Sequence, residues 1–271
     1  MSVFQITIFF LYIIAGAALA FSRLPGEAAR ARTLLILASV CAITGLAWHS
    51  TTLWQYIIMP QGLSLSMGNA ASFIGLQLAL IGILGALEPR LRGLSGGLFI
   101  LAALAGAFTD LQPLAGAAAD SIGWQLKAHV LISLFAYGLL SVGAIVALFA
   151  LVQEKRLQAG KLSAANQLFA PLETSEELLF GITSAGFLGL LLAVFSGFAF
   201  VDNLFAQHLV HKTALSILAL VLFGVLLGGR QFAGWRGKRA VYLYLWGFLI
   251  LCLAYFGSRY VLEQVLGRSW S

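Results

Sequence analysis

Charged residues are scarce in this sequence. Only 10% of the 271 residues are Asp, Glu, Lys or Arg, whereas 61% are hydrophobic. A soluble domain usually carries about 25% charged residues, so this chain has too little polar surface to cover a globule in water. The composition excludes soluble enzymes and nucleic-acid-binding proteins, and it predicts a membrane protein.

Several chemical motifs are also missing. The two cysteines, Cys41 and Cys252, stand far apart, so there is neither a CxxC pair for thiol–disulfide exchange nor a CxxCH motif for covalent haem attachment. The chain has no Walker A sequence and no glycine-rich phosphate loop, which argues against ATP-driven work. Its apolar runs are continuous rather than alternating, which excludes a membrane β-barrel.

Eight apolar stretches are long enough to cross a bilayer, which requires about 20 residues in a helix. We expect these spans at about 3–21, 33–54, 69–87, 94–109, 127–152, 178–201, 213–228 and 240–262. The predicted fold class is all-α, a polytopic membrane helix bundle of about eight transmembrane helices that forms a single integral membrane domain over 1–271. The long connection 153–180 is too polar for lipid, and its apolar side chains favour an interfacial helix.

The basic residues predict the orientation of the bundle. Twelve of the 16 Lys and Arg residues fall in the first, third, fifth and seventh connections. Because Lys and Arg accumulate in cytoplasmic loops, both termini are expected on the non-cytoplasmic side of the inner (plasma) membrane. The opposite face holds only Lys127, Lys212, Arg259 and Arg268.

All four histidines lie near this predicted outer face. His129 and His211 begin two different spans at the same depth, and two neutral imidazoles across a gap between helices would form an axial pair for haem iron. His208, three residues before His211, would compete for the same role. For His49, near the outer end of the second span, an interhelical hydrogen bond is an equally open interpretation.

Three of the four outer cations are candidates for binding the propionates of a haem. Lys127 lies two residues before His129, Lys212 follows His211, and Arg259 closes the last span. Their positions favour an anionic porphyrin, whose propionates need cations at the water boundary. The alternative is that they snorkel to the surface at helix ends. A zinc or copper site is less favoured because the set lacks thiolates.

Three ordered segments carry a family resemblance. They are LKAHVLISLFAY at 126–137, PLETSEELLFGITSAGFLGLLLAVFSGFAF at 171–200, and GWRGKRA at 234–240 with the following Gly247-Phe248 and Tyr255-Phe256-Gly257. The segment SMGNAASFIG at 66–75 matches more loosely. Together they resemble the haem-handling membrane proteins of cytochrome c assembly, a family that includes CcsA, CcmC and HemX-like proteins. The YpjD-like inner-membrane branch is most similar, and the shared core covers about 61–262.

This resemblance implies a membrane protein that holds haem b non-covalently near its outer face. It implies that His129 is the first outer histidine, His211 the second, and His49 the counterpart of a membrane-embedded one. Full assembly proteins present haem on a tryptophan-rich outer loop, but the corresponding loop here, 200–208, is short and has no tryptophan. We therefore expect a non-catalytic, HemX-like or accessory role rather than covalent haem attachment.

The expected partners are haem, the lipid bilayer, and a membrane or periplasmic protein of cytochrome or haem metabolism, with no nucleic acid. One alternative is an accessory or regulatory membrane protein that acts through contacts, for instance at the cytoplasmic connection 153–177. Another is a small-molecule transporter, but the sequence shows neither an internal repeat nor a clear mid-membrane charge.

Overall fold

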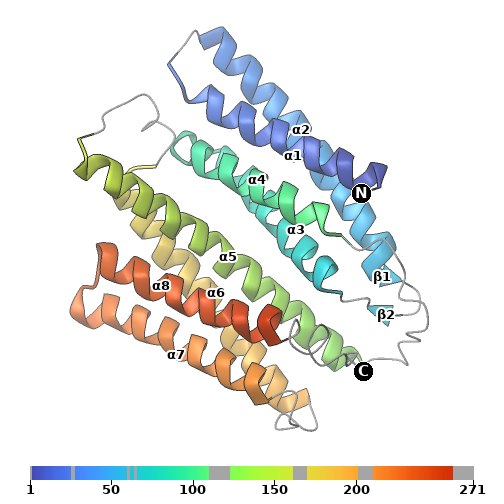
Figure 1. The fold of residues 1–271 in the computed structure, drawn as a ribbon, viewed down its shortest axis with the longest axis vertical. Coiled ribbons are helices and arrows are strands. Elements are labelled where there is room, and N and C mark those ends of the chain that lie inside the picture. The colour runs from blue at the N-terminus through green and yellow to red at the C-terminus, as the bar shows by residue number, and fades with distance from the viewer. Residues whose placement is uncertain are drawn as a thin grey trace. The chain divides into compact units, whose positions relative to one another are not determined.

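The computed structural model of the protein describes residues 2–25, 28–59, 62–63, 66–109, 123–160, 170–200 and 210–258, and most of these residues are helical (Figure 1). The helices are α1 (Val3–Ser22), α2 (Ala28–Ile57), α3 (Met67–Ala86), α4 (Arg92–Ala107), α5 (Trp124–Gln158), α6 (Leu172–Phe200), α7 (Val210–Ala233) and α8 (Gly237–Cys252). A π-helical turn, Leu253–Gly257, continues α8. Shorter elements are the 3₁₀ turn η1 (Pro89–Leu91) and the antiparallel pair β1 (Ile58–Met59) and β2 (Gly62–Leu63).

Eight of the described helices, taken with their adjoining turns, are long and apolar enough to span a membrane. This finding confirms the predicted all-α class and number of spans. Several helices extend beyond their apolar cores: α2 begins at Ala28 rather than at 33, and α5 continues to Gln158 rather than ending at 152. Hydropathy marks the part of a helix that lies in lipid, whereas good helix formers such as alanine and arginine continue the helix outside it.

The connection after α5 is shorter than the sequence suggested. Because α5 ends at Gln158 and α6 begins at Leu172, the predicted long loop 153–180 was wrong at both ends. Residues 161–169, which include most of the predicted interfacial helix, lie outside the described residues. The sidedness of the termini stays a prediction.

The chain divides into two compact units. The first comprises Met1–Ile122 with Leu148–Glu177, and the second comprises Gly123–Ala147 with Leu178–Ser271. Helix α5 therefore contributes its first part to the second unit and its last part to the first. The expectation of a single membrane domain over 1–271 stays a prediction.

In the first unit, small residues bring the helices close together. Helix α1 packs on α2 and α4, and α3 packs on α4. At the α1–α4 crossing a Cβ on Gly16 would lie 2.8 Å from the carbonyl oxygen of Gly96, so neither position has room for a side chain. The side chain of Phe99 packs beside this crossing, and the side chains of Ile8, Tyr12 and Phe99 are almost fully buried.

The second unit is a bundle of α6, α7, α8 and the first part of α5, in which α7 and α8 are antiparallel neighbours (Figure 1). Gly189 of α6 packs against Ala136 of α5, where an added Cβ would lie 3.1 Å from the alanine Cβ. Tyr244 of α8 is buried, and its hydroxyl donates to the carbonyl oxygen of Leu140 at 2.7 Å. These contacts hold α6 and α8 against α5, which carries His129.

Candidate functional site

The second unit contains a pocket between its helices. Helices α5, α6 and α7 and the π-helical turn all contribute, and most of the lining is apolar. The lining residues are His129, Val130, Ser133, Leu134, Tyr137, Leu190, Ala193, Val194, Gly197, Phe198, Lys212, Thr213, Ser216 and Tyr255. The enclosed cavity is small, about 130 Å³, and the pocket is partly open. A large ligand would therefore be covered only in part.

The imidazole of His129 is held by a serine on the neighbouring helix. Its Nδ1 lies 2.9 Å from Oγ of Ser196, and this hydroxyl lies 3.0 Å from the carbonyl oxygen of Ala193, to which it donates. When the single proton of this hydroxyl points to Ala193, the Ser196 oxygen accepts from Nδ1–H. The hydrogen bond selects the tautomer with its lone pair on Nε2, which is the form in which histidine binds metals.

The surroundings of the ring leave Nε2 available. Within the described part of the chain, the imidazole contacts two groups of α6, the Ser196 hydroxyl through Nδ1 and the backbone carbonyl of Ala193, and no side chain bonds Nε2. The ring packs against Gly197 of α6, where a Cβ would lie only 3.2 Å from Cε1 of the imidazole. The glycine thus makes room for a half-buried imidazole in the pocket wall.

A lysine and a tyrosine complete the polar part of the pocket. Nζ of Lys212 lies 5.3 Å from the centroid of the Tyr255 ring, a cation–π contact. Tyr255 belongs to the π-helical turn, and such turns are frequent at functional sites. Tyr137 fixes this region because its hydroxyl donates to the carbonyl oxygen of Leu251 at 2.6 Å. The pocket therefore combines an imidazole, a positive charge and aromatic surface.

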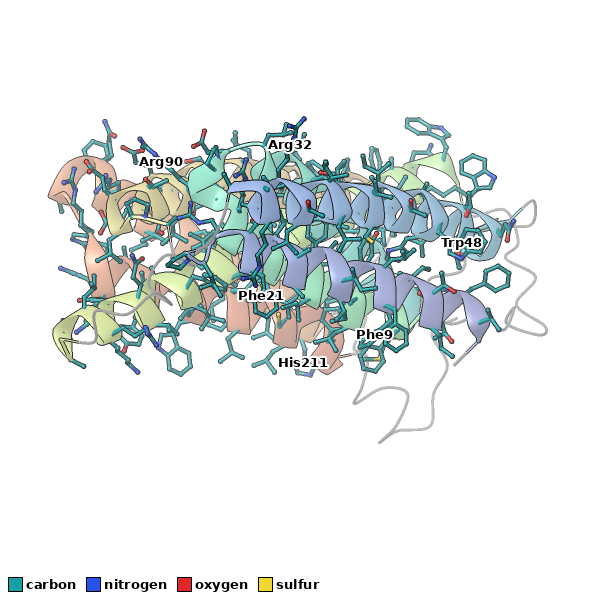
Figure 2. The ribbon with its side chains drawn as sticks, turned by 90° about the horizontal axis from the view of Figure 1, so that it is seen from above. Phe9, Phe21, Arg32, Trp48, Arg90 and His211 are labelled. Atoms are coloured by element: carbon teal, nitrogen blue, oxygen red, sulfur yellow. The ribbon has the colours of Figure 1, made fainter. Side chains whose placement is uncertain are left out.

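Of the remaining predicted site residues, those that the structure describes do not line this pocket. His211 is exposed in the first turn of α7, and its side chain lies on the outside of that helix (Figure 2). Lys127 is half-buried on α5 but is not in the pocket wall. His208 and Arg259 lie outside the described residues. The structure thus brings His129 and Lys212 together, and the roles of the others stay predictions.

His49 lies in the first unit, where it is completely buried in a chain of hydrogen bonds. Thr109 Oγ1 donates to the carbonyl oxygen of Gly106 at 2.7 Å and accepts from Ser72 Oγ at 2.6 Å. Ser72 Oγ must then accept from Nε2–H of His49 at 2.8 Å, and Nδ1 accepts from the hydroxyl of Tyr12 at 3.3 Å. Both ring nitrogens thus take part in hydrogen bonds between helices, in agreement with the interhelical-bond interpretation, and a role of His49 in haem binding stays a prediction.

Sequence reasoning missed Ser196, Gly197 and Tyr255. A serine–glycine pair in an otherwise apolar span is a visible signal, but it does not indicate which helix it faces. The described residues contain no group of three or more His, Cys, Asp or Glu side chains that could hold a metal ion. A single well-oriented imidazole suits a ligand that brings most of its own metal coordination, as a porphyrin does.

Comparisons with known proteins agree with the helical membrane architecture. The sequence matches the model of the cytochrome c assembly protein family over residues 37–266. Inner membrane protein YpjD of Escherichia coli K12 is 33% identical over 238 residues, which cover 84% of this chain and 88% of the relative. An uncharacterised 28.8 kDa protein of Azospirillum brasilense is 31% identical over 148 residues, 54% of each chain. No solved structure matches. The protein therefore belongs to the cytochrome c assembly family and is a multi-pass protein of the inner membrane.

Proposed function

We propose that the protein holds b-type haem non-covalently in the pocket of the second unit, with Nε2 of His129 as an iron ligand. The observation that carries this proposal is the bond from Nδ1 of His129 to Ser196, which leaves the Nε2 lone pair available in a mostly apolar pocket. A hydrogen-bond acceptor on the other ring nitrogen is typical of metal-binding histidines. Membership of the cytochrome c assembly family makes haem the group to test first.

The other pocket residues suit haem by their chemistry. Lys212 offers a positive charge to a propionate, and the ring of Tyr255 offers an aromatic face to the porphyrin. Bound haem would supply a redox-active iron. The protein's own contribution is to orient the imidazole and to cover part of the macrocycle. A partly open pocket favours reversible holding, so we propose a haem carrier or accessory protein and not an enzyme.

The second axial ligand and the sidedness are further parts of the proposal. His211 is adjacent to Lys212, and it is proposed as the second ligand from the resemblance alone. The distribution of Lys and Arg supports a site on the non-cytoplasmic side. A membrane or periplasmic protein of cytochrome or haem metabolism would then receive or deliver the haem.

Haem content of purified variants tests the proposal. The full-length protein is purified in detergent from haem-replete cells, and haem per protein is measured as the pyridine haemochrome. His129→Ala should lose at least nine-tenths of the haem, because it removes the iron ligand. Thr213→Ala, which alters the same pocket without removing a metal ligand, should retain it. Equal haem content in His129→Ala and Thr213→Ala would contradict the proposal.

His211→Ala tests the second ligand separately. If His211 completes the coordination, its loss converts a six-coordinate spectrum into a five-coordinate one while haem stays bound. An unchanged spectrum would remove His211 from the ligand set. Variants are compared only as monodisperse protein, so that loss of haem is distinguished from misfolding.

A further inference from the structure

Two glycines and a tryptophan shape the turn between α7 and α8. Gly234 and Gly237 adopt φ values of +61° and +60°, a left-handed conformation that favours glycine. The backbone N–H of Trp235 donates to the carbonyl oxygen of Gly229 at 3.0 Å. The Trp235 ring covers Gly229 so closely that a Cβ there would collide with it. The turn therefore fixes a tryptophan against the end of α7.

Two arginines of this region are held by aromatic rings. The guanidinium carbon of Arg239 lies 3.8 Å from the centroid of the Trp235 ring, and that of Arg230 lies 4.6 Å from the centroid of the Phe180 ring. Nη1 of Arg230 is buried and has no hydrogen-bond partner. Among the described residues, no carboxylate pairs with Arg230, Arg236 or Arg239. The charges of Arg230 and Arg239 are thus positioned by aromatic rings, and no carboxylate of the described residues neutralises them.

The same turn exposes a large apolar side chain. Phe232, in the last turn of the α7 span, is 90% exposed. A phenyl ring is poorly accommodated in water, and phenylalanine is among the apolar side chains that bury into the boundary between headgroups and acyl chains. The exposed cations Arg236, Lys238 and Arg239 follow within seven residues. An apolar ring next to cations is complementary to the surface of a bilayer, where acyl chains lie next to anionic headgroups.

We propose that the turn Gly229–Arg239 docks the phosphate headgroups of anionic phospholipids. Phe232 enters the lipid boundary, while Arg236 and Arg239 contact headgroup phosphates. Arginine binds phosphate through several N–H donors, and the Trp235 ring holds one guanidinium in place for this contact. The inference goes beyond haem binding and does not depend on it.

Native mass spectrometry of the full-length protein in detergent tests this docking surface. The protein is titrated with phosphatidylglycerol or with phosphatidylcholine. The double variant Arg236→Gln/Arg239→Gln should bind phosphatidylglycerol about fivefold more weakly for each cation removed. Phosphatidylcholine binding should change less than twofold. The matched control is Arg90→Gln/Arg92→Gln, which removes the same charge from the turn between α3 and α4.

The control variant distinguishes a specific lipid-binding site from a general effect of surface charge. Equal losses of phosphatidylglycerol affinity in the two double variants would overturn the proposal. Trp235→Leu keeps every charge but removes the ring beneath Arg239, and it should also weaken phosphatidylglycerol binding. Displacement of bound lipid by millimolar inorganic phosphate would overturn the assignment to lipid and favour free phosphate. Retention of lipid under that phosphate supports the proposal.

Discussion

Replacing Ser196 by alanine should weaken haem binding without removing any residue of the pocket wall. Ser196 does not line the pocket, and its hydroxyl acts through the imidazole of His129. In Ser196→Ala, Nδ1–H loses its acceptor, so the imidazole can rotate or take the other tautomer. The lone pair of Nε2 is then no longer fixed toward a ligand.

The expected magnitude follows from this geometry. Loss of the hydrogen-bond acceptor behind a metal-binding histidine typically lowers metal affinity by about 10–100-fold, about 1.4–2.8 kcal/mol. The carbonyl oxygen of Ala193 also faces the imidazole and is released from Ser196 by the substitution. Because this carbonyl can accept part of the lost hydrogen bond, we expect the lower end, about tenfold.

Titration of apo-protein with haemin, followed by Soret absorbance, measures the effect. Ser196→Thr keeps the hydroxyl and should restore most of the affinity. Ser133→Ala is the matched control, because Ser133 lines the same pocket but its hydroxyl donates to the backbone oxygen of His129 at 2.8 Å. The control should remain within twofold of the wild type.

A redox readout distinguishes positioning from a general loss of structure. The hydrogen bond from Nδ1–H makes the imidazole a stronger donor to iron, which favours the ferric state. Its loss in Ser196→Ala should therefore raise the haem midpoint potential. Equal dissociation constants and equal potentials for Ser196→Ala and Ser133→Ala would refute the reasoning.

Two further predictions concern side-chain packing and hydrogen bonding within each unit. Gly143→Ala would place a methyl group against the buried ring of Tyr244 and should lower the free energy of unfolding by about 1–3 kcal/mol, measured as a lower Tm in detergent. Ser72→Ala leaves Nε2–H of His49 without its acceptor and should destabilise the protein by about 1–3 kcal/mol. Haem per folded protein should stay unchanged in Ser72→Ala, because both ring nitrogens of His49 are engaged in hydrogen bonds between helices.

Matched substitutions provide the controls. Gly181→Ala adds the same methyl group where nothing lies within 4 Å, so its Tm should stay close to that of the wild type. Ser39→Ala removes an exposed hydroxyl that is bonded only within α2. A loss of haem in Ser72→Ala, but not in Ser39→Ala, would contradict the structural role given to His49.

The eight spans could be predicted because lipid imposes a length and an apolar composition on each helix. The exact helix ends could not, since α2 and α5 continue through residues that are good helix formers but are not apolar. Similarly, His129, Ser133 and Tyr137 recur at the i, i+4 spacing that puts them on one face of α5. The sequence shows this face but gives no sign that Ser196 lies opposite it.

The sequence did contain a signal for which of His211 and Lys212 faces the pocket. Adjacent helical residues point about 100° apart, so only one of the two can face the bundle. Lys212 shares a face with Ser216 and with the buried Phe223, whereas His211 lies off this face and is exposed. Reading the apolar period of α7 would have favoured Lys212 as the pocket residue. The position of Tyr255 depends on a π-helical turn, which no pattern in the sequence predicted.

Haem stoichiometry of the wild-type protein tests the central claim most directly. The full-length protein is purified from haem-replete cells, and its oxidised and reduced absorption spectra are recorded together with haem per chain. We predict a b-type spectrum at close to one haem per protein, which is lost in His129→Ala. Absence of haem from well-folded protein, even after reconstitution with haemin, would contradict it.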